Sequence, residues 1–342
     1  MAKQRYRLTD RKSKVTVSDV ARLAEVSDST VSRIMRGQGL VADATREKVM
    51  ATVRALGYVP NRIAGSLASL DSRLVGVVIP SLSNIVFPEI LQGINAGLLG
   101  TNRQSVISVT DYDLDKEEEV VRNLLAWQPA AVLIAGSVHT DATQKMLENS
   151  GVRVIEFMEI DHPPIDTAVG LSHVAAGKAA ARHLMQRGYR RFGYVGYGGT
   201  QDLRARMRYR GLCEGLAEAG LAFVAECVSD GQTTVAKGKA QTAEICARLQ
   251  DLDVLTFSSD DMAVGGLFHC LGAGIRVPKD LGLFGFNGLD IGRALPQPLS
   301  TVRTNRFEIG KRAIEEFLAN PTRPLQPQII DTGFEIFEGA TA

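Results

Sequence analysis

The apolar positions near the start of the chain recur at the spacing of short helices. Those of the first helix sit at helical spacing and comprise Val17, Val20, Ala21 and Leu23. Val26 and Val31 fall where this helix and a second one must pack together. Ser27 can cap the second helix, because its hydroxyl is placed to accept a hydrogen bond from the first turn. The pattern predicts two short amphipathic helices around a tight turn.

The second of these helices has a polar outer face, from which Asp28, Ser29 and Arg33 project. Two short helices with small polar residues where the second begins are typical of a helix-turn-helix, whose second helix enters the major groove of DNA. For the stretch Thr16–Arg33 taken alone, a generic helical hairpin remains the alternative.

A third helix is predicted over Asp43–Leu56. Its apolar face comprises Val49, Val53 and Leu56, and Gly57 is placed to end it. Pro60 breaks the pattern, and Asn61–Leu70 can form one more short helix that Gly65 and Ser66 weaken. A segment of marginal helix propensity between two domains suits a coupling element.

From Leu74 onward the pattern of apolar positions changes to that of an α/β protein. Apolar, β-branched runs form a first series, Leu74–Pro80, Ser105–Thr110, Ala130–Gly136 and Val152–Met158, and a second, Arg190–Tyr197, Asp253–Asp260 and Leu281–Asn287. Apolar strands that alternate with helices indicate parallel sheets covered on both faces. Two series predict two doubly wound lobes, with a ligand cleft at the carboxyl ends of the strands.

The charge is unevenly distributed along the 342 residues, although the net value is only +1. Residues 1–72 hold 13 Lys and Arg against 7 Asp and Glu, whereas the remainder holds 26 against 31. A basic N-terminal part on a mildly acidic body points to contact with a polyanion at one end. The basic arm of residues 1–14 can either touch phosphates or remain a solvated tail.

Cysteine usage and hydropathy indicate the compartment. The four cysteines lack metal-ligand spacing, and we expect all of them to be buried thiols in a reducing cytoplasm: Cys213, Cys227, Cys246 and Cys270. No signal peptide is evident, and no apolar run approaches the roughly 20 residues of a membrane span. We therefore expect a cytoplasmic protein without membrane contact.

The motifs of common enzyme classes are missing. Gly196–Gln201 follows a predicted strand, but Gln201 stands where a dinucleotide loop needs its third glycine. The five histidines show no metal spacing, and no nucleophile elbow is present. We expect no catalysis, no cofactor and no metal. A transport-type binding protein is the other alternative, which would explain the body but not the basic helical head.

Several motifs in one order resemble the lac/gal repressor family of bacterial transcription regulators. They are TVSDVARLAEVSDSTVSRIM, TREKVMATVRALGYVPNRIAGSLA, SSDDMAVGG and GIRVPKDLGLFGFNGLDIG. Details such as IPSLSNIVFPEILQGI look most like gluconate-type repressors. The resemblance implies a helix-turn-helix head on a two-lobed body like periplasmic sugar-binding proteins.

The resemblance also implies domain boundaries. We expect a basic flexible arm at 1–14, the DNA-binding head at 15–59, a hinge at 60–72 and an effector-binding and dimerisation domain at 73–342. Within the last, lobe 1 takes in about 73–172 and 303–331, and lobe 2 about 173–302 and 332–342. The sequence contains no leucine heptads of the kind that would indicate a tetramer, so a homodimer is expected.

In such a family the head reads a near-palindromic operator. Asp28, Ser29 and Arg33 match the base-reading positions, and an arginine fork suits guanine. Asp28 can accept from a cytosine amino group or reject a nearby phosphate. Candidates for phosphate contact, each of which can instead be an ordinary cap or surface hydroxyl, are Thr16, Ser27, Thr30, Ser32 and Asn61. In the hinge, Leu67 matches a minor-groove wedge with Ala64 one turn before it, although a leucine that packs between domains is the alternative.

The cleft of the body would bind a small-molecule effector that changes operator affinity. Candidate residues at strand ends, or matched to the family cleft, are Ser81, Ser83, Asn84, Phe87, Arg204, Arg208, Asp261 and Asn287. Arginine suits a carboxylate and the others suit hydroxyls, which favours a sugar acid such as gluconate, 2-ketogluconate or 6-phosphogluconate. A solvated helix face remains the alternative for the arginines. A neutral sugar or a purine remains the alternative for the effector.

Overall fold

The computed structural model describes residues 15–35, 41–59, 72–197, 202–249 and 251–342. The chain forms two compact units, residues 1–71 and 72–342, called here the head and the body. The expectations for the basic arm, for the hinge residues Asn61, Ala64 and Leu67, and for most of Gly196–Gln201 lie outside the described residues.

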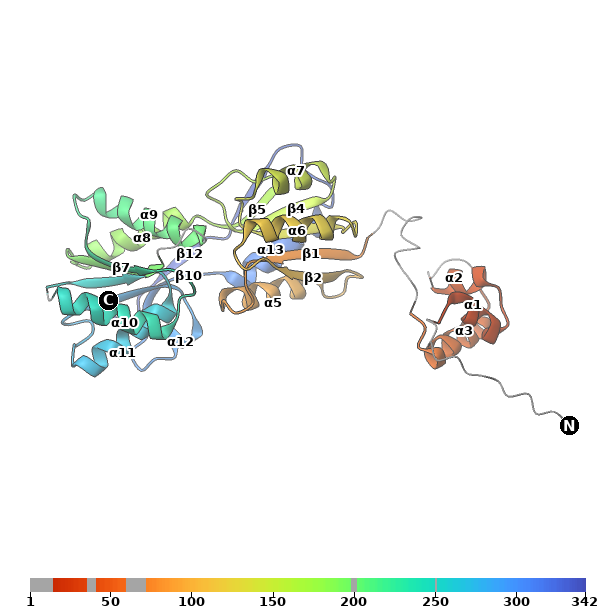
Figure 1. Ribbon diagram of the computed structural model, residues 1–342, viewed down its shortest axis with the longest axis horizontal. Helices are drawn as coiled ribbons and strands as arrows, with labels where there is room; N and C mark the ends of the chain where they lie inside the picture. Colours follow the sequence, from red (N-terminus) through yellow and green to blue (C-terminus); the bar gives the residue numbers. More distant parts are fainter. Residues whose placement is uncertain (1–14, 36–40, 60–71, 198–201, 250) are drawn as a thin grey trace. The chain divides into compact units, whose positions relative to one another are not determined.

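The head contains the three predicted helices, α1 (Val17–Ala24), α2 (Asp28–Met35) and α3 (Asp43–Leu56) (Figure 1). Their shared core comprises Val20, Ala21, Ala24, Val31, Ile34, Val49 and Val53. Leu23 lies in α1 as expected from its spacing, but the residue is 51% exposed and does not belong to this core. Ala24 is buried instead, since it lies one full turn after Val20 and on the same face.

The body is built on two six-stranded sheets. The first has the order β11-β5-β4-β3-β1-β2 and the second β12-β10-β9-β8-β6-β7, and only the β10–β12 pair is antiparallel among the described pairs. The first sheet comprises β1 (Leu74–Ile79), β2 (Gln104–Val109), β3 (Ala131–Ala135), β4 (Arg153–Glu159), β5 (Thr167–Leu171) and β11 (Gln328–Asp331). The second comprises β6 (Phe192–Tyr197), β7 (Phe223–Ser229), β8 (Val254–Phe257), β9 (Gly282–Asn287), β10 (Ser300–Thr304) and β12 (Phe334–Phe337).

Helices cover both faces of each sheet, because successive strand side chains point to opposite faces. In lobe 1 they are α5 (Val86–Leu98), α6 (Leu114–Leu125), α7 (Asp141–Asn149) and α13 (Arg306–Ala319). In lobe 2 they are α8 (His173–Gln186), α9 (Leu203–Ala217), α10 (Val235–Arg248), α11 (Asp260–Ala273) and α12 (Asp290–Arg293). The two doubly wound lobes predicted from the apolar runs are confirmed.

Neighbouring helices in the body cross at glycines. A methyl group on Gly93 of α5 would lie 2.0 Å from the carbonyl oxygen of Phe307 in α13. The pairs α8–α9 and α10–α11 approach each other in the same way, at Gly177 and at Gly265. Only glycine permits backbones this close, so each pair is held at a short interaxial distance.

The chain passes between the lobes after β5, after β10 and after β11. Arg303 and Thr304, which we assigned to lobe 1, belong to β10 of the second sheet, where they pair with Glu335 and Phe334 of β12. The predicted boundary at residue 303 therefore falls inside a strand. The physical reason is that β10 extends to Thr304 before the chain turns into α13.

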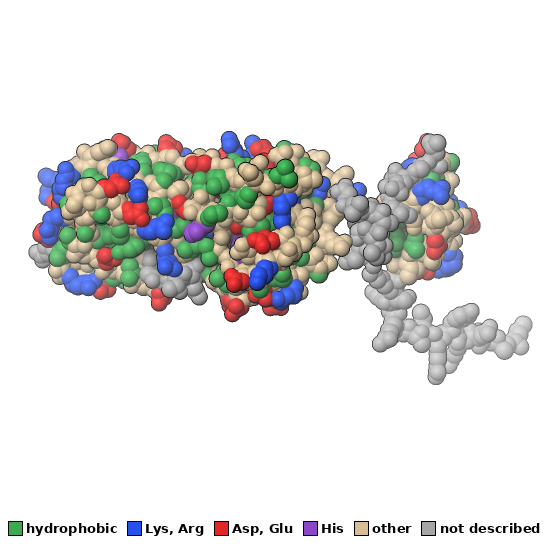
Figure 2. All heavy atoms as spheres, turned by 90° about the horizontal axis from the view of Figure 1, so that it is seen from above, with side chains coloured by type: hydrophobic (Ala, Val, Ile, Leu, Met, Phe, Trp, Pro, Cys, Tyr) green, Lys and Arg blue, Asp and Glu red, His purple; other side chains and the backbone are tan. Residues whose placement is uncertain are grey.

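The cysteines are free thiols. Cys227 and Cys270 are buried as expected, but Cys213 and Cys246 are only partly buried, so the expectation is wrong for these two. They lie on α9 and α10. Within the described ranges, no helix is long and apolar enough to cross a membrane. Basic and acidic side chains are interspersed over the face of the body seen in Figure 2.

Candidate functional site

Hydroxyl groups surround the start of α2 in the head. Ser27 Oγ accepts a hydrogen bond from the Thr30 amide over 3.2 Å, as a helix cap does. The same oxygen lies 2.8 Å from Ser29 Oγ and 2.8 Å from Thr30 Oγ1. Ser27 is thus the predicted cap, which is the ordinary alternative to a phosphate contact.

Asp28 and Thr16 also take part in local hydrogen bonds. Ser18 Oγ donates to Asp28 Oδ2 over 2.6 Å and joins the first turns of α1 and α2. Thr16 and Asp19 form a reciprocal capping box at the start of α1. The carboxylate proposed to contact a cytosine is therefore already an acceptor within the head.

The remaining candidates on α2 differ in exposure. Ser29 and Arg33 are exposed, whereas Thr30 and Ser32 are half-buried. Arg33 lies in the last turn of α2. Exposed polar side chains on the second helix of such a motif are available to a DNA groove.

The body has a cavity at the carboxyl edges of the two sheets. It occupies about 620 Å³, including space open to solvent, and residues of both lobes line it. Of the predicted effector residues, five line this cavity: Asn84, Arg204, Arg208, Asp261 and Asn287. Other lining residues, which the sequence did not single out, include Met158, His173, Asp202 and Arg306.

Two arginines, one turn apart on α9, face the cavity. Asp202 caps this helix by accepting from the Ala205 amide over 3.2 Å, and it lies 3.8 Å from Arg204 Nε. The Arg204 guanidinium carbon also lies 5.5 Å from the centre of the Phe87 ring. Phe87 does not line the cavity, but it is fully buried and supports Arg204 from lobe 1.

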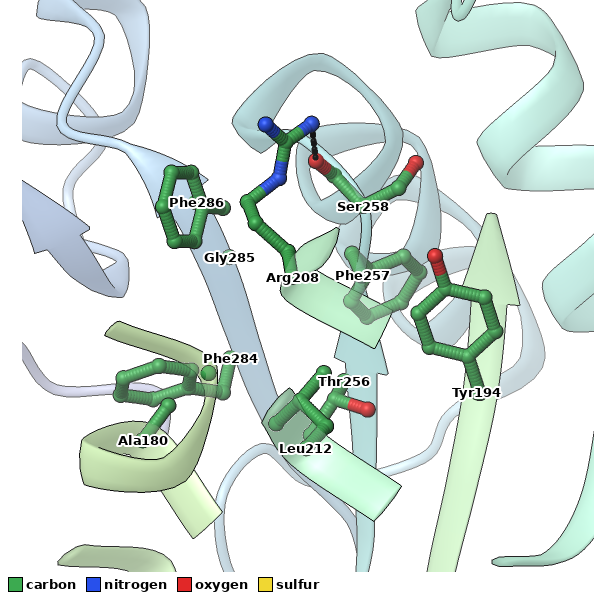
Figure 3. A pocket seen from close by; sticks show the side chains of 11 residues that line it. Ala180, Tyr194, Arg208, Leu212, Thr256, Phe257, Ser258, Phe284, Gly285 and Phe286 are labelled. Carbon is green, nitrogen blue, oxygen red and sulfur yellow. Dashed lines mark hydrogen bonds between the residues drawn. The ribbon is translucent and has the colours of Figure 1, made fainter. Parts of the chain in front are cut away.

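The groups in direct contact with Arg208 carry no charge, although the charged Asp202 and Arg204 line the same cavity. Its Nη2 donates to the Ser258 carbonyl over 3.2 Å, and its guanidinium lies 4.6 Å from the Phe286 ring centre (Figure 3). No carboxylate of the described residues lies within ion-pair distance of it, and its buried Nε has no hydrogen-bond partner among them. Burial lowers the pKa of Arg208, partly offset by Asp202, but a guanidinium stays charged in proteins.

The serines of lobe 1 have structural roles. Ser81 Oγ accepts from the amides of Ser83 and Asn84 over 3.1 and 3.2 Å, so it stabilises the turn after β1. Ser83 Oγ accepts from Gln232 Nε2 of lobe 2 over 2.9 Å. Asn84 donates to Tyr112 Oη over 2.8 Å and, unlike the two serines, lines the cavity.

On the opposite wall, Asp261 and Asn287 offer oxygen atoms to the cavity. Asp261 lies in the first turn of α11, and burial raises the pKa of its carboxyl. Asn287 ends β9 with a φ of 117°, and its carbonyl accepts from Arg306. Arg306 is in turn held by Glu89 at 2.7 Å, so its charge is compensated. Its position near the cavity depends on packing between the lobes and had no sequence signal.

Comparisons with known proteins agree with this arrangement. Residues 16–61 match the family described as bacterial regulatory proteins, lacI family, and residues 181–332 match a periplasmic binding protein-like domain. The HTH-type transcriptional regulator GntR of Pseudomonas aeruginosa is 36% identical over 94% of this chain and 94% of its own length. The regulator of the same name from Escherichia coli K12 is 31% identical over 97% of this chain and 99% of its own.

A solved structure is similar over nearly the whole length as well. The crystal structure of a lacI-family transcriptional regulator from Silicibacter pomeroyi is 42% identical, covers 96% of this chain and 99% of that one, and superposes with a TM-score of 0.90. Similarity of this extent includes both the helical head and the two-lobed body. The chain therefore belongs to the lacI family of bacterial regulatory proteins and is a DNA-binding transcription regulator.

Proposed function

We propose that this protein is a homodimeric repressor of genes for sugar-acid catabolism, without catalytic activity. A sugar acid such as gluconate, 2-ketogluconate or 6-phosphogluconate binds between the lobes and changes the affinity for a near-palindromic operator. The observation that carries the proposal is Arg208, a charged guanidinium at the cavity whose own charge no described carboxylate pairs with.

The polar lining supports a ligand with one acidic end and several hydroxyls. An arginine fork binds a carboxylate through two parallel hydrogen bonds. Asn84, Asp261 and Asn287 provide amide and carboxylate groups around the same cavity, and such groups suit hydroxyls. A neutral sugar would leave the buried charge of Arg208 without a partner, which costs binding energy.

On the DNA side, the exposed Ser29 and Arg33 are the base-reading residues that we propose on α2. Leu67, with Ala64 and Asn61, lies outside the described residues, and its role as a minor-groove wedge rests on the resemblance of the sequence. Two protomers would present two α2 helices to the two halves of the operator.

Coupling between the two sites would act through the arrangement of the lobes. Ser83 bonds to Gln232 and Phe87 contacts Arg204, so both lobes already touch around the cavity. A ligand that favours one arrangement over another shifts the population, and couplings of about 1–3 kcal/mol are usual.

The test is calorimetric titration of the full-length protein with gluconate, 2-ketogluconate, 6-phosphogluconate and glucose, followed by operator binding with and without each compound. We expect saturable binding of at least one acid and a change in operator affinity. Arg208→Ala should abolish the acid response, whereas Arg206→Ala, an exposed arginine on the same helix, should retain it.

Two results would change the assignment. Binding of glucose without binding of any acid would replace the sugar acid by a neutral effector. Turnover of a sugar acid by the purified protein would show an enzyme instead of a regulator of this kind.

A further inference from the structure

His173 lies between the two lobes and beside Arg208. It is the first residue of α8 and follows β5 by one residue, where the chain leaves the first sheet. His173 is only 2% exposed. Its ring nitrogen Nε2 lies 3.2 Å from the carbonyl oxygen of Met158 in β4. The backbone amide of His173 donates to Asp161 Oδ2 over 2.7 Å. Lobe 1 thus holds the ring through Met158 and the backbone through Asp161.

The contact with Met158 determines which ring nitrogen carries the proton. A carbonyl oxygen can only accept, so Nε2 carries a proton, and in a neutral imidazole Nδ1 then presents a lone pair. Nδ1 lies 3.5 Å from Arg208 Nη1, and the imidazole is tilted against Phe286 at a centroid distance of 6.0 Å. The geometry makes the imidazole an acceptor toward the guanidinium.

The surroundings favour a neutral imidazole. Burial, followed by the charges of Arg208 and Arg204, lowers the pKa of His173 well below its usual value. The neighbouring carboxylate of Asp161 accepts hydrogen bonds from the amide of His173 and from Ser172 Oγ. A protonated ring would place a second positive charge beside Arg208 without a paired anion.

Neutrality has a consequence for ligand binding. A carboxylate in place of the imidazole would orient Arg208 equally well, but it would also cancel the charge of the guanidinium. The groups that contact Arg208, namely the Ser258 carbonyl, the Phe286 ring and the His173 ring, orient it while leaving that charge to an incoming anion.

We propose that His173 is a positioning residue that orients Arg208 as a neutral acceptor and thereby selects for effectors with a carboxylate. This inference rests on the proposed sugar-acid function. It adds a residue that the sequence did not single out and that acts through Arg208 from lobe 1.

The test compares two variants that differ in charge and hardly in shape. In the full-length protein, His173→Gln supplies a neutral side chain with an acceptor, and His173→Glu supplies a negative one. We expect calorimetry with gluconate, 2-ketogluconate or 6-phosphogluconate, whichever the wild-type protein binds, to show near wild-type affinity for His173→Gln. The affinity of His173→Glu for the same acid should fall about 10- to 100-fold, because the new carboxylate would pair with Arg208. The effector would then lose a hydrogen bond to a charged group.

His269→Glu, on α11 and outside the cavity lining, controls for an added acid elsewhere in lobe 2. Equal losses of affinity in His173→Gln and His173→Glu would show that His173 has a purely structural role. That result would overturn this proposal and leave the proposed function standing. A wild-type protein that binds none of the acids would overturn the proposed function and this selectivity role together.

A measurement on the unliganded wild-type protein covers the case in which His173→Glu does not fold. Nitrogen NMR of the imidazole, assigned by comparison with His173→Gln, reports which nitrogen is protonated. We expect the neutral Nε2–H form from pH 6 to 8. An imidazolium, or the Nδ1–H form, would overturn the proposal.

Discussion

Gly177 of α8 lies directly against the carbonyl group of Arg208 in α9. A methyl group at Gly177 would be 2.3 Å from that oxygen, and one at Gly211 would be 2.2 Å from the carbonyl oxygen of Val174. The two helices thus cross through a reciprocal glycine contact immediately beneath the arginine that faces the cavity. The position of Arg208 depends on this contact.

The substitution Gly177→Ala should separate α8 from α9 and displace Arg208. Overpacking of this kind typically costs about 1–3 kcal/mol of unfolding free energy. We expect denaturant unfolding to show that loss, and calorimetry to show weaker binding of the acidic effector.

Gly272→Ala is the matched control, because Gly272 is also helical and a methyl group there meets nothing within 4 Å. A helical glycine with free space gains stability on replacement by alanine, by about 0.5–1 kcal/mol. If Gly177→Ala were as harmless as Gly272→Ala, the close crossing of α8 and α9 would not position the site.

His139 should make the stability of the body depend on pH. Its Nδ1 lies 2.6 Å from Glu117 and its Nε2 lies 3.5 Å from Glu156, and all three side chains are buried. Burial by itself lowers the pKa of His139, but the hydrogen bonds and charges of Glu117 and Glu156 outweigh it and raise the pKa to about 9.

A folded-state pKa above the unfolded value means that the folded state binds the proton more tightly. The resulting stabilisation, about 3 kcal/mol, is fully present below about pH 6.5 and is lost as the pH rises through 9. His139→Gln should therefore destabilise the body most at pH 6 and least above pH 9.

Fluorescence of Trp127, the single tryptophan of the chain, follows this unfolding because it lies just after α6 in lobe 1. The measured quantity is the difference in unfolding free energy between wild type and His139→Gln at each pH. A difference that stays constant from pH 6 to 9 would contradict a protonated His139 in the folded body.

Asp28 should act within the head more than on a base. Its carboxylate accepts from Ser18 over 2.6 Å. We expect Asp28→Ala and Ser18→Ala to destabilise the head by similar amounts, about 0.5–1.5 kcal/mol. The measurement is hydrogen exchange, which should become faster at the backbone amides of α1 and α2 in both variants. A changed operator preference in Asp28→Ala, with none in Ser18→Ala, would restore base reading by Asp28.

Arg33 should carry base specificity. It is exposed in the last turn of α2, where a guanidinium can reach guanine O6 and N7. Arg33→Gln should weaken operator binding by about 1–3 kcal/mol and relax the preference at one base pair per half-site. Binding-site selection with random duplexes measures this, with Arg54→Gln in the last turn of α3 as an exposed control. Equal preferences in wild type and Arg33→Gln would remove Arg33 from the base-reading set.

The strands that the sequence predicted are those with long apolar runs. Each run from Leu74–Pro80 to Leu281–Asn287 overlaps a strand of the structure. The strands that were missed are short or carry a weak pattern: β5, β7, β10, β11 and β12. β11 and β12 have only four residues each, of which those of β11 are mostly exposed and those of β12 mostly half-buried, and they exist as strands because β5 and β10 provide their partners.

The candidate site shows the same division. Arg208 was singled out because it matches an effector-binding arginine of the family, and the structure shows that Arg204 and Arg208 both line the cavity from α9. Ser81 and Ser83 looked equally suitable as ligands, but their hydroxyls are used in local and interlobe hydrogen bonds. His173 and Arg306 face the cavity from distant parts of the chain, so no local pattern marked them.

The sequence by itself determined the helical head and the two series of apolar strands, because each follows from local periodicity, whereas Arg208 was marked only by its match to the family. Only the tertiary structure decided that Arg208 is held by uncharged groups and that Asp28 is tied to Ser18. Those properties depend on which residues, far apart along the chain, are brought within hydrogen-bond distance when the elements pack.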